Sequence, residues 1–195
     1  MKLLLSITLS ILSFSSFAGV TEWIDFKLEG GHVKIPVVVA GVETFAMLDT
    51  GAQINAINKA FVNKNKLSFD KGRDVRIRGV FGTQKQPSYN NVPINFFGID
   101  TELDKLVQTS LGFHTTGLLF GAGFFDKFIV QLDYPNQKMR LVGRDALSVD
   151  EFKNIEIQRQ KGTGMPIVKI RLPDEKHLWL LLDTGNSGGM VVERK

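Results

Sequence analysis

The chain has 195 residues, a formal net charge of +4 and no cysteine. The lack of cysteine excludes disulfides, thiolate metal sites and cysteine nucleophiles. The charge is modest, with 24 basic and 20 acidic side chains, and is typical of an ordinary globular protein rather than a nucleic-acid-binding one.

The first 18 residues have the pattern of a secretory signal peptide. A positive start at Lys2 precedes an apolar run from Leu3 to Leu12, and Ser16-Phe17-Ala18 has the small-residue spacing of a cleavage site. We therefore expect a mature chain that begins at Gly19. The apolar run is too short for a membrane span, so no integral membrane segment is expected in the mature chain. A secreted chain without disulfides favours a bacterial periplasm.

Strand patterns and turns follow one another through the next part of the chain. Residues 32–39 are rich in β-branched side chains, residues 40–43 read as a turn, and residues 44–48 return as the next strand. Residues 58–65 are compatible with a short helix. Residues 73–78 alternate basic and apolar side chains, as a half-exposed strand does.

Basic side chains gather between Lys59 and Lys85, where Asp70 and Asp74 interrupt them and no regular ladder of aromatic side chains is interleaved. This composition favours a solvated surface over a nucleic-acid or anionic-surface site. Within the segment, Gly79-Val80-Phe81-Gly82-Thr83 is typical of a hairpin tip, because its glycines permit positive φ angles.

One motif occurs twice and organises the chain. The apolar run 45–48 leads into Asp49-Thr50-Gly51-Ala52, and the apolar run 178–182 leads into Asp183-Thr184-Gly185. The two aspartates are 183 − 49 = 134 residues apart. A carboxyl after a run of core residues is costly unless it is paired or hydrogen-bonded, so two such sites in one chain indicate a function.

A second motif lies between the two aspartates. Gly117-Leu118-Leu119-Phe120-Gly121 precedes a segment, residues 120–128, that we expect to be a short helix. Residues 128–132 and 138–142 then flank a turn at Tyr134-Pro135 and are expected to form a hairpin.

These residues resemble the retropepsin-like aspartic peptidases, in which Asp-Thr-Gly-Ala ends a buried strand and two copies meet face to face. The apolar-apolar-Gly motif and its helix are the second hallmark of that family, and both motifs occur here in the family's order. The resemblance implies a mostly β, retropepsin-like (acid protease) closed β-barrel lobe with one short helix, followed by the initial strands of a second, incomplete lobe. It further implies a substrate-covering flap at Val80, Phe81, Gly82 and Thr83.

We accordingly expect a signal peptide at 1–18, a retropepsin-like lobe at 19–147 and a partial second lobe at 148–195. The second repeat stops soon after Gly185, and Asn186 stands where the family has Ala or Ser. Two arrangements therefore remain open. Asp183 pairs with Asp49 of the same chain, or two chains form a homodimer through Asp49.

The residue types define the chemistry. Two carboxyls held close together cannot both ionise cheaply, so they share one proton. The ionised partner takes a proton from a water that attacks a peptide carbonyl, while the protonated partner hydrogen-bonds the carbonyl oxygen. This predicts Asp49 and Asp183 as catalytic residues acting on a polypeptide. Thr50, Gly51, Ala52, Thr184 and Gly185 are predicted to hold the two loops, and no metal or cofactor is expected.

Other interpretations start from the same sequence. A non-catalytic periplasmic module that binds peptides or assists assembly would keep the lobe without the activity, and a truncated product of a longer gene would explain the short second repeat. Gly185-Asn186-Ser187-Gly188-Gly189 resembles a serine-nucleophile motif, but only six residues follow it and none is His. The three histidines, His32, His114 and His177, lack metal-ligand spacing.

Overall fold

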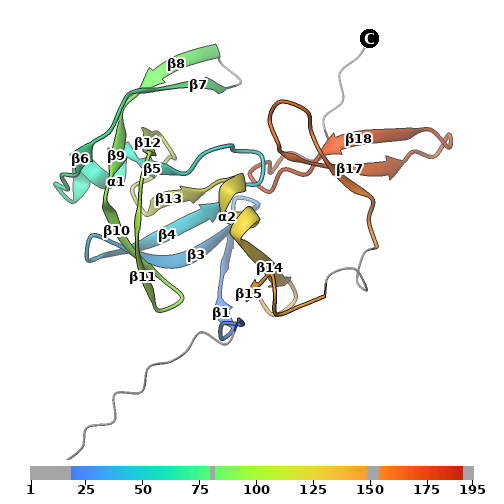
Figure 1. Ribbon diagram of the computed structural model, residues 1–195, viewed down its shortest axis with the longest axis horizontal. Coiled ribbons are helices and arrows are strands. Elements are labelled where there is room, and N and C mark those ends of the chain that lie inside the picture. Colours follow the sequence, from blue (N-terminus) through green and yellow to red (C-terminus); the bar gives the residue numbers. More distant parts are fainter. Residues whose placement is uncertain (1–18, 80–81, 149–153, 191–195) are drawn as a thin grey trace, which may run out of the picture.

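The fold is that of a computed structural model, which describes residues 19–79, 82–148 and 154–190 (Figure 1). The expected signal peptide and two of the four flap residues, Val80 and Phe81, lie outside the described residues. No helix in the described part of the chain is long and apolar enough to cross a membrane.

A ten-stranded sheet forms the body of the molecule. Its strands, in order across the sheet, are β11 (Ile99–Leu103), β10 (Val92–Phe96), β3 (His32–Val39), β4 (Val42–Leu48), β13 (Thr116–Phe120), β5 (Ala56–Asn58), β12 (Leu106–Thr109), β9 (Ser88–Asn90) and β6 (Asp70–Lys71), with β2 (Lys27–Glu29) paired to β3. The mostly β fold class predicted from the sequence is confirmed.

Strands β3 and β4 form a hairpin inside the main sheet. The two strands pair antiparallel from Lys34↔Met47 to Val39↔Val42. Ala40 and Gly41, at the tip between them, both have positive φ angles of 49° and 79°, which is the geometry of the tight turns that suit the twist of a hairpin. Burial alternates along both strands, so one side chain in two enters the core.

Strand β13 lies between β4 and β5, although both precede it in the sequence. It runs parallel to β4, with Phe120 opposite Leu48, and antiparallel to β5. The loop that leaves β4 at Asp49 must therefore pass the end of β13 to reach β5. The Asp49 N–H donates a 2.9 Å hydrogen bond to the Phe120 carbonyl at this crossing. The topology thus brings the first Asp-Thr-Gly motif beside the apolar-apolar-Gly motif.

The core behind this crossing is aromatic. The Phe120 and Phe124 rings stack with centroids 4.6 Å apart, and Phe96 lies 5.6 Å from Phe120 and 6.0 Å from Phe124. All three side chains are buried. Phe124 belongs to helix α2 (Ala122–Lys127), so this cluster fixes the helix against the main sheet.

Three smaller sheets complete the part of the chain that the structure describes. They are the sheet of β1 (Ile24–Asp25), β15 (Lys138–Gly143) and β14 (Phe128–Asp133), the hairpin of β7 (Val75–Gly79) and β8 (Gly82–Gln86), and the C-terminal sheet of β16 (Ile157–Arg159), β17 (Pro166–Arg171) and β18 (His177–Leu181). Helix α2 lies between the main sheet and the C-terminal sheet (Figure 1). No described residue from 154 to 190 is buried, so the C-terminal sheet has no core of its own.

Two details of the expected fold are wrong. The resemblance implied one short helix, whereas the described residues contain two. The additional helix, α1 (Lys59–Lys64), forms in the segment that the sequence left compatible with a helix, where the Asn58 side chain caps it by accepting from the Ala60 N–H at 3.1 Å. Among the described strands no pairing joins β11 to β6, so the sheet is a curled half-barrel and not a closed barrel. Closure is not expected physically, because β6 has only two residues and β11 is largely exposed.

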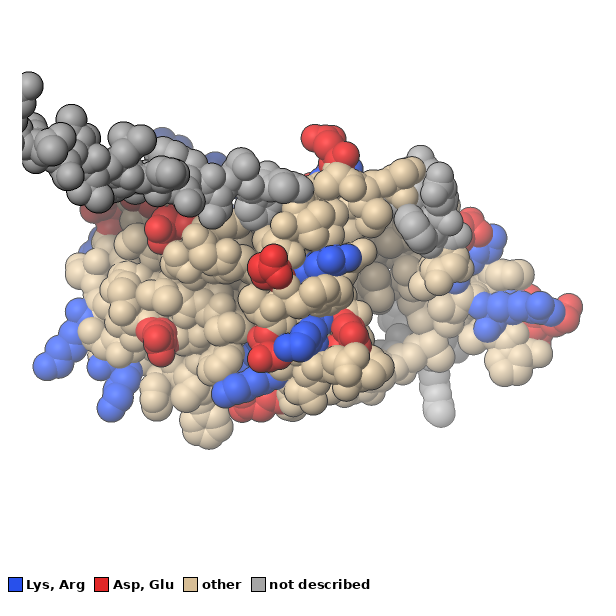
Figure 2. All heavy atoms as spheres, turned by 90° about the horizontal axis from the view of Figure 1, so that it is seen from below, with Lys and Arg blue, Asp and Glu red and all other residues tan. Residues whose placement is uncertain are grey.

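The charged surface is mixed in sign. On the face seen in Figure 2, Lys and Arg side chains lie among Asp and Glu side chains. Within the basic segment, Lys85 lies 3.1 Å from the Asp74 carboxylate. These neighbours fit the solvated surface predicted from the composition.

We expect Phe120→Ala to lower the free energy of unfolding by about 3–5 kcal/mol, because it removes the centre of the aromatic cluster and leaves a cavity. Urea unfolding followed by circular dichroism measures the change. Phe113→Ala is the control, since Phe113 is 85% exposed and its loss should cost less than about 0.5 kcal/mol. Equal effects of the two substitutions would contradict the proposed core.

Candidate active site

The first Asp-Thr-Gly loop leaves β4 and closes on itself. The Asp49 Oδ1 atom accepts hydrogen bonds from the Gly51 N–H at 2.9 Å and the Ala52 N–H at 3.0 Å. Thr50 is buried beneath the loop. These bonds fix the orientation of the carboxyl group without blocking its second oxygen.

The second loop leaves β18 with a related geometry. The Asp183 Oδ1 atom accepts from the Gly185 N–H at 2.9 Å, the counterpart of the Gly51 bond. The Asn186 N–H donates instead to the Asp183 carbonyl at 3.2 Å, and no bond from it to the carboxyl is present among the described residues. The Asp183 carboxyl thus accepts one backbone N–H bond where the Asp49 carboxyl accepts two, and the position after the glycine is Asn186 in the second loop and Ala52 in the first.

Four hydrogen bonds join the two loops reciprocally. The Thr50 N–H donates to Thr184 Oγ1 and the Thr184 N–H donates to Thr50 Oγ1, each at 3.1 Å. The Thr184 hydroxyl donates to the Leu48 carbonyl at 2.9 Å, and the Thr50 hydroxyl donates to the Leu182 carbonyl. Each hydroxyl therefore donates its one proton and accepts one hydrogen bond, and the two threonines do so symmetrically.

The glycines of the two motifs allow the carboxyls to approach. A Cβ atom built on Gly51 would overlap the Asp183 carboxyl, and one built on Gly185 would overlap the Asp49 carboxyl. Each aspartate therefore lies over the glycine of the other loop. The structure brings Asp49 and Asp183 of a single chain together, as the first of the two arrangements predicted from the sequence requires.

This environment raises the pKa of Asp49 above its ordinary value of 3.8. The largest cause is loss of solvation, followed by repulsion from the Asp183 carboxyl, and a hydrogen bond with Asp183 adds to the rise. The N–H groups of Gly51 and Ala52 act in the opposite direction, because they stabilise the charged form. The balance favours retention of a proton on Asp49.

The expected flap is described only in part. Gly82 and Thr83 are exposed at the start of β8, paired with Gly79 and Arg78 of β7. The hairpin of β7 and β8 extends away from the main sheet (Figure 1). A covering role for this hairpin therefore stays a prediction.

Sequence reasoning missed a support behind the first loop. The Asn55 side chain accepts from the Gly121 N–H at 3.0 Å, and the Ala52 carbonyl accepts from the Ala122 N–H at 2.7 Å. Both bonds tie the start of α2 to the aspartate loop. A signal was present, since Asn55 is a polar residue in the otherwise apolar stretch 54–57, but its partner is 66 residues away.

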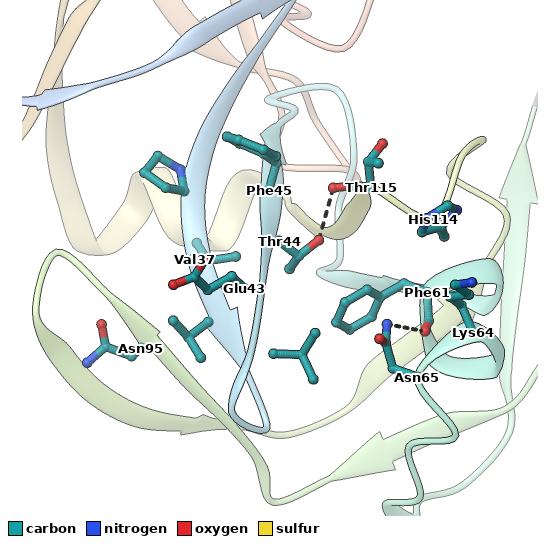
Figure 3. Close-up of a pocket in the computed structure, with 13 residues that line it drawn as sticks. Val37, Glu43, Thr44, Phe45, Phe61, Lys64, Asn65, Asn95, His114 and Thr115 are labelled. Carbon is teal, nitrogen blue, oxygen red and sulfur yellow. Dashed lines mark hydrogen bonds between the residues drawn. The ribbon is translucent and has the colours of Figure 1, made fainter.

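A hollow in the main lobe lies away from the two aspartates. It has a volume of about 670 Å³ and lies over β3, β4 and α1, with Phe61 at its floor and His114 and Lys64 at its edge (Figure 3). Neither aspartate lines it. Among the described residues, no group of three or more His, Asp or Glu side chains is placed to hold a metal ion.

Part of the main lobe matches a known protein family. Residues 35–112 match the family described as aspartyl protease. This part of the main lobe is therefore similar to the aspartyl protease family. The match includes Asp49, Thr50, Gly51 and Ala52 and confirms the retropepsin-like resemblance, whereas Asp183 lies outside it.

Three solved structures are similar to the chain. The EIAV protease complexed with the inhibitor HBY-793 is 20% identical, with a TM-score of 0.40, over 48% of this chain and 84% of the other. The simian foamy virus (mac) protease is 17% identical, with a TM-score of 0.34, over 46% and 88%. A retropepsin-like aspartic protease from Rickettsia conorii is 20% identical, with a TM-score of 0.42, over 63% and 90%. No curated protein matches the chain.

The raised pKa of Asp49 makes a prediction for stability. The folded state holds the Asp49 proton more tightly than the unfolded state, so the contribution of Asp49 to stability is greatest below pH 3.8 and falls as pH rises through the raised folded pKa. Asp49→Asn should therefore increase the urea midpoint near pH 7 and have little effect near pH 3. Asp145→Asn, at an exposed position, is the control and should change neither. A lower midpoint for Asp49→Asn at neutral pH would contradict the pairing.

Proposed function

We propose that the chain is an aspartic endopeptidase that hydrolyses peptide bonds with a water activated between Asp49 and Asp183. The observation that carries the proposal is the reciprocal bonding of Thr50 and Thr184, which holds the two carboxyls over each other's glycine. A structural turn does not require two carboxyls that repel each other to lie face to face, whereas an acid–base pair does. The match of residues 35–112 to the aspartyl protease family supports the same chemistry and favours a polypeptide substrate.

The proposed mechanism divides the work between the two carboxyls. Asp49 retains the shared proton, because its pKa is raised, and hydrogen-bonds the substrate carbonyl oxygen. Asp183 takes a proton from the water as the water oxygen attacks the carbonyl carbon. The proton then passes to the leaving nitrogen when the C–N bond breaks. The hairpin tip with Gly82 and Thr83 is proposed to cover the bound peptide.

The proposed place of action is the bacterial periplasm, reached through a signal peptide at residues 1–18. The proposal rests on the apolar N-terminal run, the cleavage pattern at Ser16-Phe17-Ala18 and the absence of cysteine. N-terminal sequencing of the secreted protein tests it, with a mature start at Gly19 as the expected result. A chain recovered with Met1 intact would contradict it.

A binding module without catalysis is the second candidate. It is favoured by the C-terminal sheet, in which Leu181 and Leu182 are 39% and 42% exposed. A sheet that contributes so little core holds Asp183 weakly. In that case the lobe would bind peptides while the carboxyl pair forms only part of the time.

Cleavage of an unfolded protein substrate from about pH 3 to about pH 7 tests the proposal. Both Asp49→Asn and Asp183→Asn are expected to lower kcat/KM at least about a hundredfold, because each removes one half of the acid–base pair. Asp174→Asn is the control, since Asp174 lies in the exposed turn before β18. The kcat/KM of the wild type should fall as the pH rises through the pKa of Asp49, because Asp49 then loses the proton that it supplies to the substrate carbonyl oxygen.

Each other outcome has a distinct meaning. Loss of activity only in Asp49→Asn would replace the single-chain pair by a homodimer through Asp49, and sedimentation would then show two chains. A folded wild-type chain that binds the substrate without cleaving it would overturn the peptidase and favour the binding module.

A further inference from the structure

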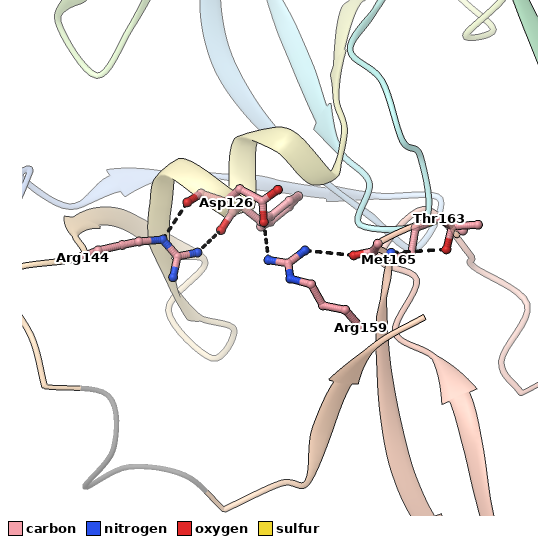
Figure 4. Close-up of polar contacts among 7 residues, drawn as sticks. Asp126, Arg144, Arg159, Thr163 and Met165 are labelled. Atoms are coloured by element: carbon pink, nitrogen blue, oxygen red, sulfur yellow. Dashed lines mark hydrogen bonds and ion pairs between the residues drawn. The ribbon is translucent and has the colours of Figure 1, made fainter. Parts of the chain in front are cut away.

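A group of polar contacts joins the C-terminal sheet to the main lobe (Figure 4). The Arg159 guanidinium pairs with the Asp126 carboxylate and donates to the Gly164 carbonyl at 2.9 Å. The Gln53 side chain donates to the Thr163 carbonyl at 2.9 Å. We call these five residues the clasp; they are Gln53, Asp126, Arg159, Thr163 and Gly164.

The lobe side of the clasp is tied to the Asp49 loop. Gln53 belongs to that loop directly. Asp126 lies at the end of α2, and the start of α2 is bonded to the loop through the Ala122 N–H and the Ala52 carbonyl at 2.7 Å. Arg144 donates to the carbonyls of Phe125 and Asp126, at 2.8 and 2.6 Å, and so fixes the last turn of the helix.

The other side of the clasp is tied to the Asp183 loop. Arg159 pairs with Pro166 across β16 and β17. The Pro166 carbonyl accepts from the Leu182 N–H at 2.9 Å, and Leu182 directly precedes Asp183. Arg159 is therefore linked to Asp183 through two successive pairings, that of β16 with β17 and that of β17 with the residue after β18.

Apolar packing at this junction is thin. A cavity of about 260 Å³ lies between α2 and the C-terminal sheet, and its lining includes Phe125, Ile157 and Leu182 together with Arg144 and Arg159. No described residue from 154 to 190 is buried. Because little apolar surface is removed from water here, polar contacts have a larger share in docking the sheet than they have in a well-packed core.

We propose that Arg159 and Asp126 are positioning residues, which hold the C-terminal sheet against α2 and thereby keep Asp183 opposite Asp49. The docking part of this inference stands on the contacts alone, and its effect on catalysis rests on the proposed peptidase function. An exposed ion pair by itself contributes little. Arg159 differs from an isolated pair because its planar fork contacts both sides of the junction at once.

Amide hydrogen exchange tests the docking directly. The Thr184 N–H is bonded to Thr50 across the pair, so its exchange rate reports separation of the two loops. Arg159→Gln should speed exchange at Thr184 about three- to tenfold, the size expected for loss of one charge-assisted contact at a partly exposed site. The amides of β3 and β4 should keep their wild-type rates. Equal acceleration in β3 and β4 would mean general destabilisation and would overturn the proposal, as would an unchanged rate at Thr184.

Arg171→Gln is the matched control. Arg171 lies in the same sheet and pairs with Glu175 four residues later, within the C-terminal sheet's own hairpin. The same substitution there should leave the Thr184 rate unchanged. Asp126→Asn should match Arg159→Gln, and the double variant should lose no more than either single one, because the two residues act through one contact. Additive effects would contradict a shared role.

The catalytic consequence is read from kcat/KM of the same variants. If the wild type cleaves peptides, Arg159→Gln should lower kcat/KM in proportion to the fraction of chains whose two loops have separated, and Arg171→Gln should keep the wild-type value. If the wild type does not cleave but Thr184 still responds to Arg159→Gln, the clasp stands and the peptidase proposal fails. If the wild type cleaves and Thr184 does not respond, the clasp fails and the peptidase proposal stands.

Discussion

The reciprocal hydrogen bonds between Thr50 and Thr184 are the constraint on which the candidate site depends. They hold two loops that are 134 residues apart, and they bring together two carboxyls that repel each other when both are charged. Glycine at positions 51 and 185 leaves the space that each carboxyl occupies. Without this network, Asp49 and Asp183 would be two unrelated polar residues at strand ends.

The two halves of the site are supported very differently. The Asp49 loop is bonded to β13 through Phe120 and to α2 through Ala122, and behind both lies the aromatic cluster of the core. The Asp183 loop leaves a sheet with no buried side chain among its described residues. The geometry of the pair is therefore only as firm as the docking of that sheet, and this explains why polar contacts such as Arg159 with Asp126 matter for a site they do not touch.

The sequence was sufficient for features that are local. The two Asp-Thr-Gly triplets, the strands before them and the helix after Gly121 could be predicted, because each is written in a few consecutive residues. The helix at Lys59–Lys64 also lies in a segment that the sequence marked as compatible with a helix. The open half-barrel was missed, since it depends on which strand edges meet. Asn55 and the clasp could not be predicted either, because their partners lie far away in the chain. Only the fold reveals such pairs.

Titration of the Asp49 carboxyl carbon by NMR tests the central claim most directly. It would be followed in the wild type and in Asp183→Asn, at a concentration where sedimentation shows single chains. Pairing within one chain predicts a wild-type midpoint above the ordinary value of 3.8 and a lower midpoint in Asp183→Asn, because the substitution removes the repelling charge. The same midpoint in both proteins would contradict the account, since Asp183 would then not face Asp49.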